Sequence, residues 1–231
     1  GVMVQTSCAA LPREPAARQA SRISCGTSNG AESHFRFFRA PAISSWRTAE
    51  MTAPAIVWLR RDLRLSDQPA FAAAAADGPV IPIFVLDDER ARERKAGGAA
   101  RWWLHGSLEA LGRELGELGS RLILRRGNAV QVLADIASET GAKTVHALRH
   151  YEPWWRDAER ELAGKLDLCL HDGNYLLPPG SVTTGGGQPY KIYTPFAKAA
   201  MQRLPGPAPL DRPGLASPDG WPVAERLAAW N

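Results

Sequence analysis

The chain has 231 residues, of which 45% are hydrophobic and 23% are charged, and its formal net charge is +4. This length leaves room for one α/β domain with additions, and no apolar run approaches the roughly 20 residues of a membrane-spanning helix. Three cysteines without C-x-x-C spacing argue against a zinc site or a disulfide framework, which favours a reducing compartment such as the cytoplasm.

The charge is distributed unevenly along the chain. Residues 1–50 carry six arginines against three glutamates, a net charge of +3, which leaves only +1 for the other 181 residues. A basic surface that binds DNA should lie on the folded domain, so composition alone does not indicate one here.

Residues 1–50 form a leader rich in Ser, Ala, Arg and Pro, with neither strand alternation nor a helical stripe. Its composition suits a transit peptide, or a segment that is non-native or lies upstream of a natural start at Met51. We favour the second interpretation, because Met51 stands directly before the first predicted strand. In either case we expect the leader to be disordered.

From Met51 on, apolar strands alternate with amphipathic helices. We predict a helix from Gln68, with Ser66 or Asp67 as its N-cap, a charged loop over 87–98, and a helix from the cap Asn128 through Ser138. The remaining predicted elements are strands at 55–59, 80–86, 121–124, 143–148 and 168–171 and helices at 99–118 and 154–166, the first of these with Trp103, Leu104, Leu108, Leu111, Leu115 and Leu118 at helical spacing. This alternation predicts a doubly wound, five-stranded parallel sheet of Rossmann-like type with right-handed crossovers.

The composition of the chain changes after Leu177. Residues 178–231 are rich in Pro and Gly, which is typical of a linker between domains, with one short helix predicted at 195–203. An amphipathic helix is then predicted from Trp221 to the end. We therefore assign 51–177 to the α/β domain, and 178–231 to a linker and the start of a second, truncated domain.

Several catalytic signatures are absent from the sequence. No G-x-G-x-x-G follows a strand, and there is no phosphate-binding loop, no G-x-S-x-G turn and no His-rich metal spacing. We therefore predict no catalytic residue and no metal ligand in this chain.

Three polar segments follow strands of the predicted sheet and should meet at its carboxyl edge, where such sheets bind ligands. The first is the turn 60–64, RRDLR, in which Asp62 is at least as well explained by pairing with its neighbouring arginines. The second is Asp87-Asp88-Glu89 opposite Arg101, which are most often solvated charges.

The third segment is 150–155, HYEPWW, in which aromatic rings surround one carboxylate. That combination suits a planar heterocycle better than it suits water, although the tryptophans also fit ordinary packing at a helix start. Each segment is a weak signal by itself, but all three fall at one edge of one sheet.

Five stretches of sequence then occur in a fixed order and spacing: IVWLRRDLRLSDQPAF, PIFVLDDE, ARWWLHGSLEALGRELGELGSRLILRRG, GAKTVHALRHYEP and LLPPGSVTTGGGQPYKIYTPF. Together they resemble the DNA photolyase/cryptochrome family over residues 54 to about 204. The resemblance implies the amino-terminal α/β domain of that family, which holds a light-harvesting antenna, methenyltetrahydrofolate or an 8-hydroxy-deazaflavin.

Asp87, Arg101 and Glu152 match positions that line the antenna cleft in this family, and we expect Tyr151 and Arg60 beside them. In the family a downstream all-helical domain binds FAD and damaged DNA, and excited FADH⁻ splits a flipped-out cyclobutane pyrimidine dimer. We expect this chain to be a fragment without that domain, inactive alone, from a lyase that is a monomer when full length.

Two alternatives remain open on the sequence. The same α/β domain occurs in cryptochrome-type blue-light photoreceptors, and nothing in it separates them from repair enzymes. A stand-alone nucleotide-binding α/β module is a weaker interpretation, against which the predicted helix from Trp221 counts.

Overall fold

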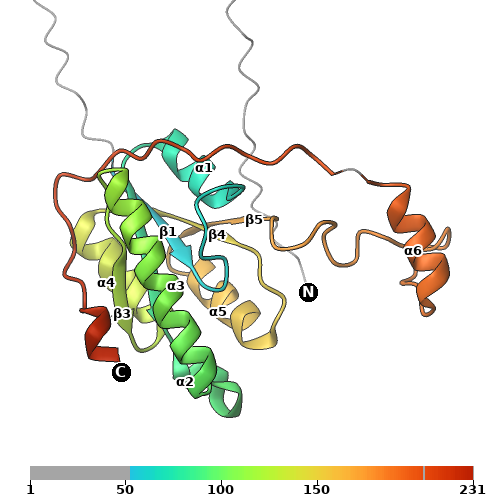
Figure 1. Cartoon of the computed structure of the whole chain (residues 1–231), viewed down its shortest axis with the longest axis horizontal. Coiled ribbons are helices and arrows are strands. Elements are labelled where there is room, and N and C mark those ends of the chain that lie inside the picture. The colour runs from blue at the N-terminus through green and yellow to red at the C-terminus, as the bar shows by residue number, and fades with distance from the viewer. Residues whose placement is uncertain (1–52, 205, 231) are drawn as a thin grey trace, which may run out of the picture. The chain divides into compact units, whose positions relative to one another are not determined.

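The computed structural model describes residues 53–204 and 206–230, apart from the side chain of Glu93. The predictions for residues 1–50 therefore lie outside the described part of the chain. The described part contains one sheet in the order β3-β2-β1-β4-β5, with every neighbouring pair parallel (Figure 1). Its strands are β1 Ala55–Leu59, β2 Val80–Leu86, β3 Ile123–Arg126, β4 Thr144–Leu148 and β5 Asp167–His171. The predicted five-stranded parallel sheet is confirmed.

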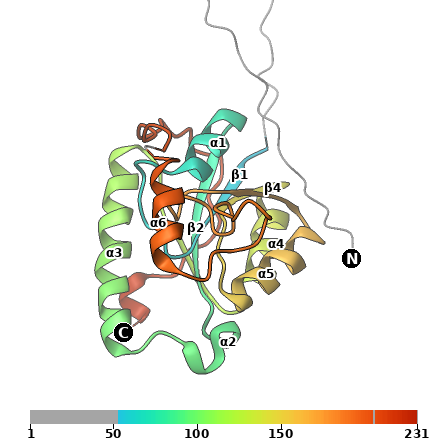
Figure 2. The ribbon, with the colours of Figure 1, turned by 90° about the vertical axis from the view of Figure 1, so that its right-hand side faces the viewer.

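Helices cover both faces of the sheet, as Figure 2 shows. Helices α1 (Pro69–Asp77) and α3 (Gly98–Glu117) pack on one face, where their buried side chains meet Val57, Leu59 and Phe84. Helices α4 (Ala129–Thr140) and α5 (Pro153–Ala163) pack on the other, against Ile56 and Trp58. Successive residues of β1 thus enter opposite cores, which explains why this central strand is apolar throughout.

Some local predictions are wrong in detail. The N-cap of α1 is Gln68, with neither Ser66 nor Asp67 in that role, and its side chain makes no capping bond because it binds Asp62 instead. The predicted loop 87–98 contains α2 (Asp88–Ala91) and the 3₁₀ turn η1 (Arg92–Arg94). Trp103, placed on the apolar stripe of α3, is 71% exposed.

Other predictions hold with small shifts of boundary. Asn128 caps α4 as expected, since its Oδ1 accepts the backbone N–H groups of Val130 and Gln131. The short helix predicted at 195–203 is α6 (Tyr193–Met201), which buries none of its residues and stands apart from the helices on the sheet (Figure 1).

The segment after α6 runs back along the α/β unit. The N–H groups of Asp67 and Val80 donate to the carbonyls of Leu210 and Ala216, each at 2.9 Å. Further on, the N–H of Glu225 donates to Leu124 O of the edge strand β3, also at 2.9 Å. This segment therefore covers part of an otherwise open sheet edge.

The prediction of a helix from Trp221 is wrong. Only the 3₁₀ turn η2 (Leu227–Trp230) forms there among the described residues. Tertiary contacts decide this conformation: Glu225 binds the backbone and side chain of Arg126, and Trp230 donates to Glu225 and packs its ring 6.1 Å from Phe84. These contacts hold the chain along β3 and override the helical pattern.

No helix in the described ranges has the length and apolar character needed to cross a membrane.

Two histidines stack on neighbouring strands on the α1 side of the sheet. The rings of His146 and His171 are nearly parallel with centroids 5.3 Å apart, and Nδ1 of His146 lies 3.1 Å from Nε2 of His171. Asp77 Oδ2 approaches the outer nitrogen of His146 at 3.2 Å. Burial, reinforced by the neighbouring His146, lowers the pKa of His171 from 6.5 to about 4.

This depressed pKa predicts a stability loss in acid. Below pH about 6.5 an unfolded His171 takes up a proton while the folded one stays neutral down to about pH 4, so the free energy of unfolding should fall across that interval. Because His171 is partly exposed, we expect a loss on the order of 1 kcal/mol, well below the full shift. Urea unfolding of wild type and His171→Gln at several pH values measures it. The variant should show a shallower dependence, and equal slopes for both proteins would contradict the assignment.

Candidate functional site

Arg60 ties the end of β1 to α5. Its side chain is fully buried, and its Nη1 donates to Glu159 Oε1 at 2.7 Å while Nη2 donates to the carbonyl of Leu148. The guanidinium also lies over the rings of Trp58 and Trp155, at 4.3 and 5.6 Å from their centroids. A sequence-predicted site residue thus joins the turn after β1 to the segment after β4.

Asp62 lies buried beside this arginine and organises the turn. Its Oδ1 accepts the N–H of Arg60 at 3.1 Å, its Oδ2 accepts the amide of Gln68 at 2.8 Å, and Nε2 of His150 lies 3.4 Å from Oδ1. Burial raises the pKa of Asp62, but the facing His150 and Arg60 outweigh burial, so the pKa lies below its ordinary value. The carboxylate is therefore ionised, and it holds the two loops together.

Glu152 is the carboxylate of this cluster that reaches solvent. Arg61 Nη1 donates to its Oε1 at 2.5 Å, and Nδ1 of His150 lies 3.5 Å from its Oε2. Its side chain is 24% exposed. Burial raises the pKa of Glu152, but backbone hydrogen bonds, His150 and Arg61 together lower it. An ionised, partly open carboxylate can accept further hydrogen bonds from a ligand.

Tyr151 faces the segment after β5. Its hydroxyl lies 3.5 Å from Asp172 Oδ1, and its ring meets that of Tyr175 edge to face, with centroids 5.3 Å apart. Burial and the nearby Asp172 raise the pKa of Tyr151, so the phenol stays protonated. An aromatic surface therefore adjoins Glu152.

Asp87 follows the last residue of β2 and lies in the protein interior. Its Oδ1 accepts the N–H of Arg90 at 3.0 Å and its Oδ2 accepts the N–H of Ala129 at 2.8 Å, so one carboxylate caps α2 and the start of α4. The side chain is fully buried. Its charge is compensated by these donors and by Arg90 Nε at 3.4 Å.

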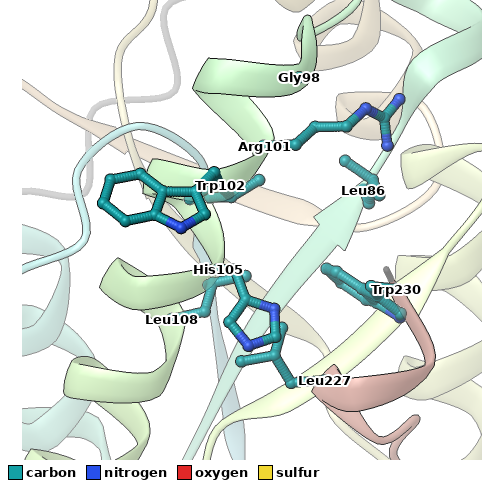
Figure 3. Close-up of a pocket in the computed structure, with 9 residues that line it drawn as sticks. Leu86, Gly98, Arg101, Trp102, His105, Leu108, Leu227 and Trp230 are labelled. Carbon is teal, nitrogen blue, oxygen red and sulfur yellow. The ribbon is translucent and has the colours of Figure 1, made fainter.

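Arg101 lies further along this edge, at the start of α3. Its Nη2 donates to Asp88 Oδ2 at 2.7 Å and its Nε to the carbonyl of Ala96 at 3.0 Å. It borders a mainly apolar cavity of about 490 Å³ between α3 and η2, which Figure 3 shows. Other residues that line this cavity are Leu86, Trp102, His105, Leu227 and Trp230.

A second hollow, the arginine cleft, lies between α2, η1 and the start of α5. Its volume is about 920 Å³, and its lining includes Arg90, Arg92, Arg94, Asn128, Trp154 and Asp157. Arg90 crosses from α2 to α5, donating to Glu161 Oε2 at 2.5 Å. Pro153, the residue directly after Glu152, also lines this cleft.

The sequence-predicted residues fall into neighbouring groups. Arg60, Tyr151 and Glu152 lie where the segments after β1 and β4 meet, whereas Asp87 and Arg101 lie at the end of β2. Within the described ranges, no hydrogen bond or ion pair joins Glu152 to either of these two. No group of three or more potential metal ligands is present among the described residues.

Sequence reasoning missed Glu159 and Arg90. Nothing in the sequence marks Glu159, because acidic residues of an amphipathic helix are usually solvated, and only its burial against Arg60 distinguishes it. The three arginines 90, 92 and 94 lie in the segment 87–98, which the sequence predicts to be a charged loop. The sequence signal that could have marked these arginines is their spacing at every second position. This spacing does not reveal that α2 and η1 turn the three side chains toward α5.

Comparison with known proteins identifies the family. The family model described as "DNA photolyase" matches residues 55–214. The chain belongs to the DNA photolyase family. Deoxyribodipyrimidine photo-lyase of Agrobacterium fabrum is 42% identical in an alignment of 189 residues that covers 78% of this chain. Cryptochrome-2 of Arabidopsis thaliana is 32% identical in an alignment of 158 residues that covers 66% of this chain.

Solved structures agree with this membership. A class III photolyase from Agrobacterium tumefaciens superposes with a TM-score of 0.72 at 40% identity, over 82% of this chain and 40% of that one. A cryptochrome from Synechocystis, at 22% identity and a TM-score of 0.65, shares the fold, over 71% of this chain and 37% of that one. The match covers 38% of the Agrobacterium fabrum photo-lyase, so this chain corresponds to the photolyase-type α/β domain.

The buried Arg60–Glu159 pair predicts a large mutational effect. Glu159→Ala should lower the free energy of unfolding by about 3–5 kcal/mol, because it leaves a buried guanidinium without its carboxylate. The control Glu139→Ala removes a partner of Arg125 whose side chain is 45% exposed, and it should cost less than about 0.5 kcal/mol. Denaturant unfolding measures both. Removing both charges in Arg60→Met/Glu159→Leu should recover part of the loss, and equal effects of the two single variants would refute a buried pair.

Proposed function

We propose that this chain is the antenna-binding α/β domain of a deoxyribodipyrimidine photo-lyase, which uses light to split cyclobutane pyrimidine dimers in DNA. The observation that carries the proposal is the 42% identity to the Agrobacterium fabrum protein of that name. FAD and the damaged DNA are assigned to a further, helical domain of the full-length protein, as the family resemblance implies. We place the domain boundary near residue 177 and propose a cytoplasmic monomer.

The proposed antenna is methenyltetrahydrofolate or an 8-hydroxy-deazaflavin, and the surroundings of Glu152 suit such a ring. The ionised Glu152 carboxylate has lone pairs open to ring N–H groups. Tyr151 and Trp154 add aromatic surface on either side of it in the sequence, and Trp154 lines the adjoining cleft. When bound, the chromophore would absorb near-UV or blue light and pass its excitation to the flavin.

In this proposal Arg60, Asp87 and Arg101 hold the segments around the chromophore in place. Arg60 is fully buried and fixes the segment that carries Glu152, while the buried Asp87 fixes the start of α4. Arg101 fixes α2 against α3 through Asp88. The contacts to the ring are then made by Glu152 and Tyr151.

A cryptochrome-type photoreceptor is the second candidate, because Arabidopsis cryptochromes also match, one at 35% identity over 147 residues. The two functions share this domain and differ in whether the excited flavin repairs DNA.

Glu152→Gln should weaken antenna binding by about tenfold to 100-fold, since it removes the charge that strengthens hydrogen bonds from ring N–H groups. The shape of the side chain is retained and its partner Arg61 is 72% exposed, so folding should be unaffected. Antenna absorbance per mole of full-length protein, titrated with each chromophore, measures the affinity. The control Glu109→Gln on α3 should bind normally. Unchanged affinity in Glu152→Gln would remove this residue from the site.

A repair assay separates the two candidate functions. The full-length protein with reduced FAD should remove dimers from damaged DNA under blue light, whereas the 231-residue chain with FAD should not exceed a flavin-only control. Dimer loss is followed by chromatography of the digested DNA. Flavin photochemistry without repair by the full-length protein would support the photoreceptor, and repair by the 231-residue chain alone would contradict the assignment of FAD to a further domain.

A further inference from the structure

The arginine cleft adjoins the residue that the proposed function assigns to the chromophore ring. Its lining includes Pro153 and Trp154, the two residues that follow Glu152 in the chain. Its volume of about 920 Å³ exceeds what a tricyclic ring alone would occupy and lies in the range of small-molecule sites. A ligand whose ring lies at Glu152 can therefore extend into this cleft.

The charges on the cleft wall favour an anion. Arg90 is already paired with Glu161 and Asp87, and Asp157 is paired with Arg160. Arg92, Arg94 and Glu89 are the other charged residues of the wall; all three are exposed, and none makes an ion pair among the described side chains. Two guanidinium groups against one carboxylate leave this wall with a net positive charge, and a guanidinium binds phosphate or carboxylate with paired hydrogen bonds.

The backbone of Arg92 has an unusual conformation. Arg92 has φ of +47°, in the left-handed region that non-glycine residues rarely adopt. This residue ends α2 and begins η1, so the reversal presents both Arg92 and Arg94 at the cleft. Strained residues concentrate at ligand-binding sites, and the strain here serves the arrangement of two cationic side chains.

The cleft also has fixed polar and aromatic walls. Asn128 is held by its capping bonds to α4 and by Arg90, at 3.3 Å, and Trp154 stands at the start of α5. The cleft wall therefore combines Trp154, two residues after Glu152 in the chain, with Arg92 and Arg94. An aromatic group and two cationic groups on one wall suit a planar chromophore with an anionic tail.

We propose that the arginine cleft binds the anionic tail of the antenna chromophore through Arg92 and Arg94. This inference rests on the proposed function and adds a specificity determinant to it. The tail chemistry is a phosphate on a deazaflavin or a glutamate carboxylate on a folate, and both are anions that these arginines can hold.

The test compares chromophores that differ only in the tail. One pair is 8-hydroxy-deazariboflavin and its phosphate ester, and the other is methenyltetrahydropteroate and methenyltetrahydrofolate. Fluorescence titration of the full-length protein should show about tenfold tighter binding for the tailed member of at least one pair, and added salt should reduce this preference. The pair that shows the preference identifies the tail.

The double variant Arg92→Gln/Arg94→Gln should abolish the preference and leave binding of the tailless member unchanged. The control Arg113→Gln/Lys165→Gln removes the same charge from exposed sites outside the cleft and should retain the preference. Equal weakening of tailed and tailless members, or no preference in the wild type, would overturn the inference while leaving the antenna function intact. Failure of all four chromophores to bind would overturn both.

Discussion

The buried Arg60–Glu159 pair is the interaction on which the carboxyl edge of the sheet depends. A guanidinium without solvent exposure requires a carboxylate and further acceptors, and Glu159 and the Leu148 carbonyl supply them. The same guanidinium lies over the rings of Trp58 of β1 and Trp155 of α5, so charge and packing act on one side chain. Because Arg60 joins β1 to the loop before α5, the positions of Asp62, His150 and Glu152 all follow from it.

The strand order explains why these residues meet. The chain builds β2 and β3 on one side of β1 and then returns to place β4 on the other side. Strands β1 and β4 are therefore adjacent and parallel, and the segments that follow them run in opposite directions away from each other. Open α/β sheets bind ligands at the carboxyl ends of two strands related in this way. The Arg61–Glu152 pair and His150, between two carboxylates, lie there. The arginine cleft is lined by Pro153 and Trp154 of the segment after β4 and by Arg90, Arg92 and Arg94 of the segment after β2.

The candidate site was predictable in part. That polar residues after β1, β2 and β4 share one edge follows from parallel strands, and His150 lies between Asp62 of the segment after β1 and Glu152 of the segment after β4. The sequence does not predict which of these residues reach solvent, because burial depends on neighbours that are distant in sequence. Arg60 and Asp87 are enclosed by α5 and α4, which leaves Glu152 and Tyr151 partly open. The roles of Glu159 and Arg90 emerge only from contacts across 99 and 71 residues.

The sequence by itself determined the strands, the parallel sheet and the family, because continuous apolar runs, helical periodicity and ordered motifs are local properties. The Asn128 cap is another local property, because its capping bonds involve residues two and three positions ahead. Only the tertiary structure decided the conformation of the last residues. The pattern from Trp221 suits a helix, but Glu225 bonds to Leu124 and Arg126 of β3, and these long-range bonds outweigh a weak helical propensity. Tertiary packing likewise turned the charged segment after Asp87 into a cleft wall, since α5 lies opposite it.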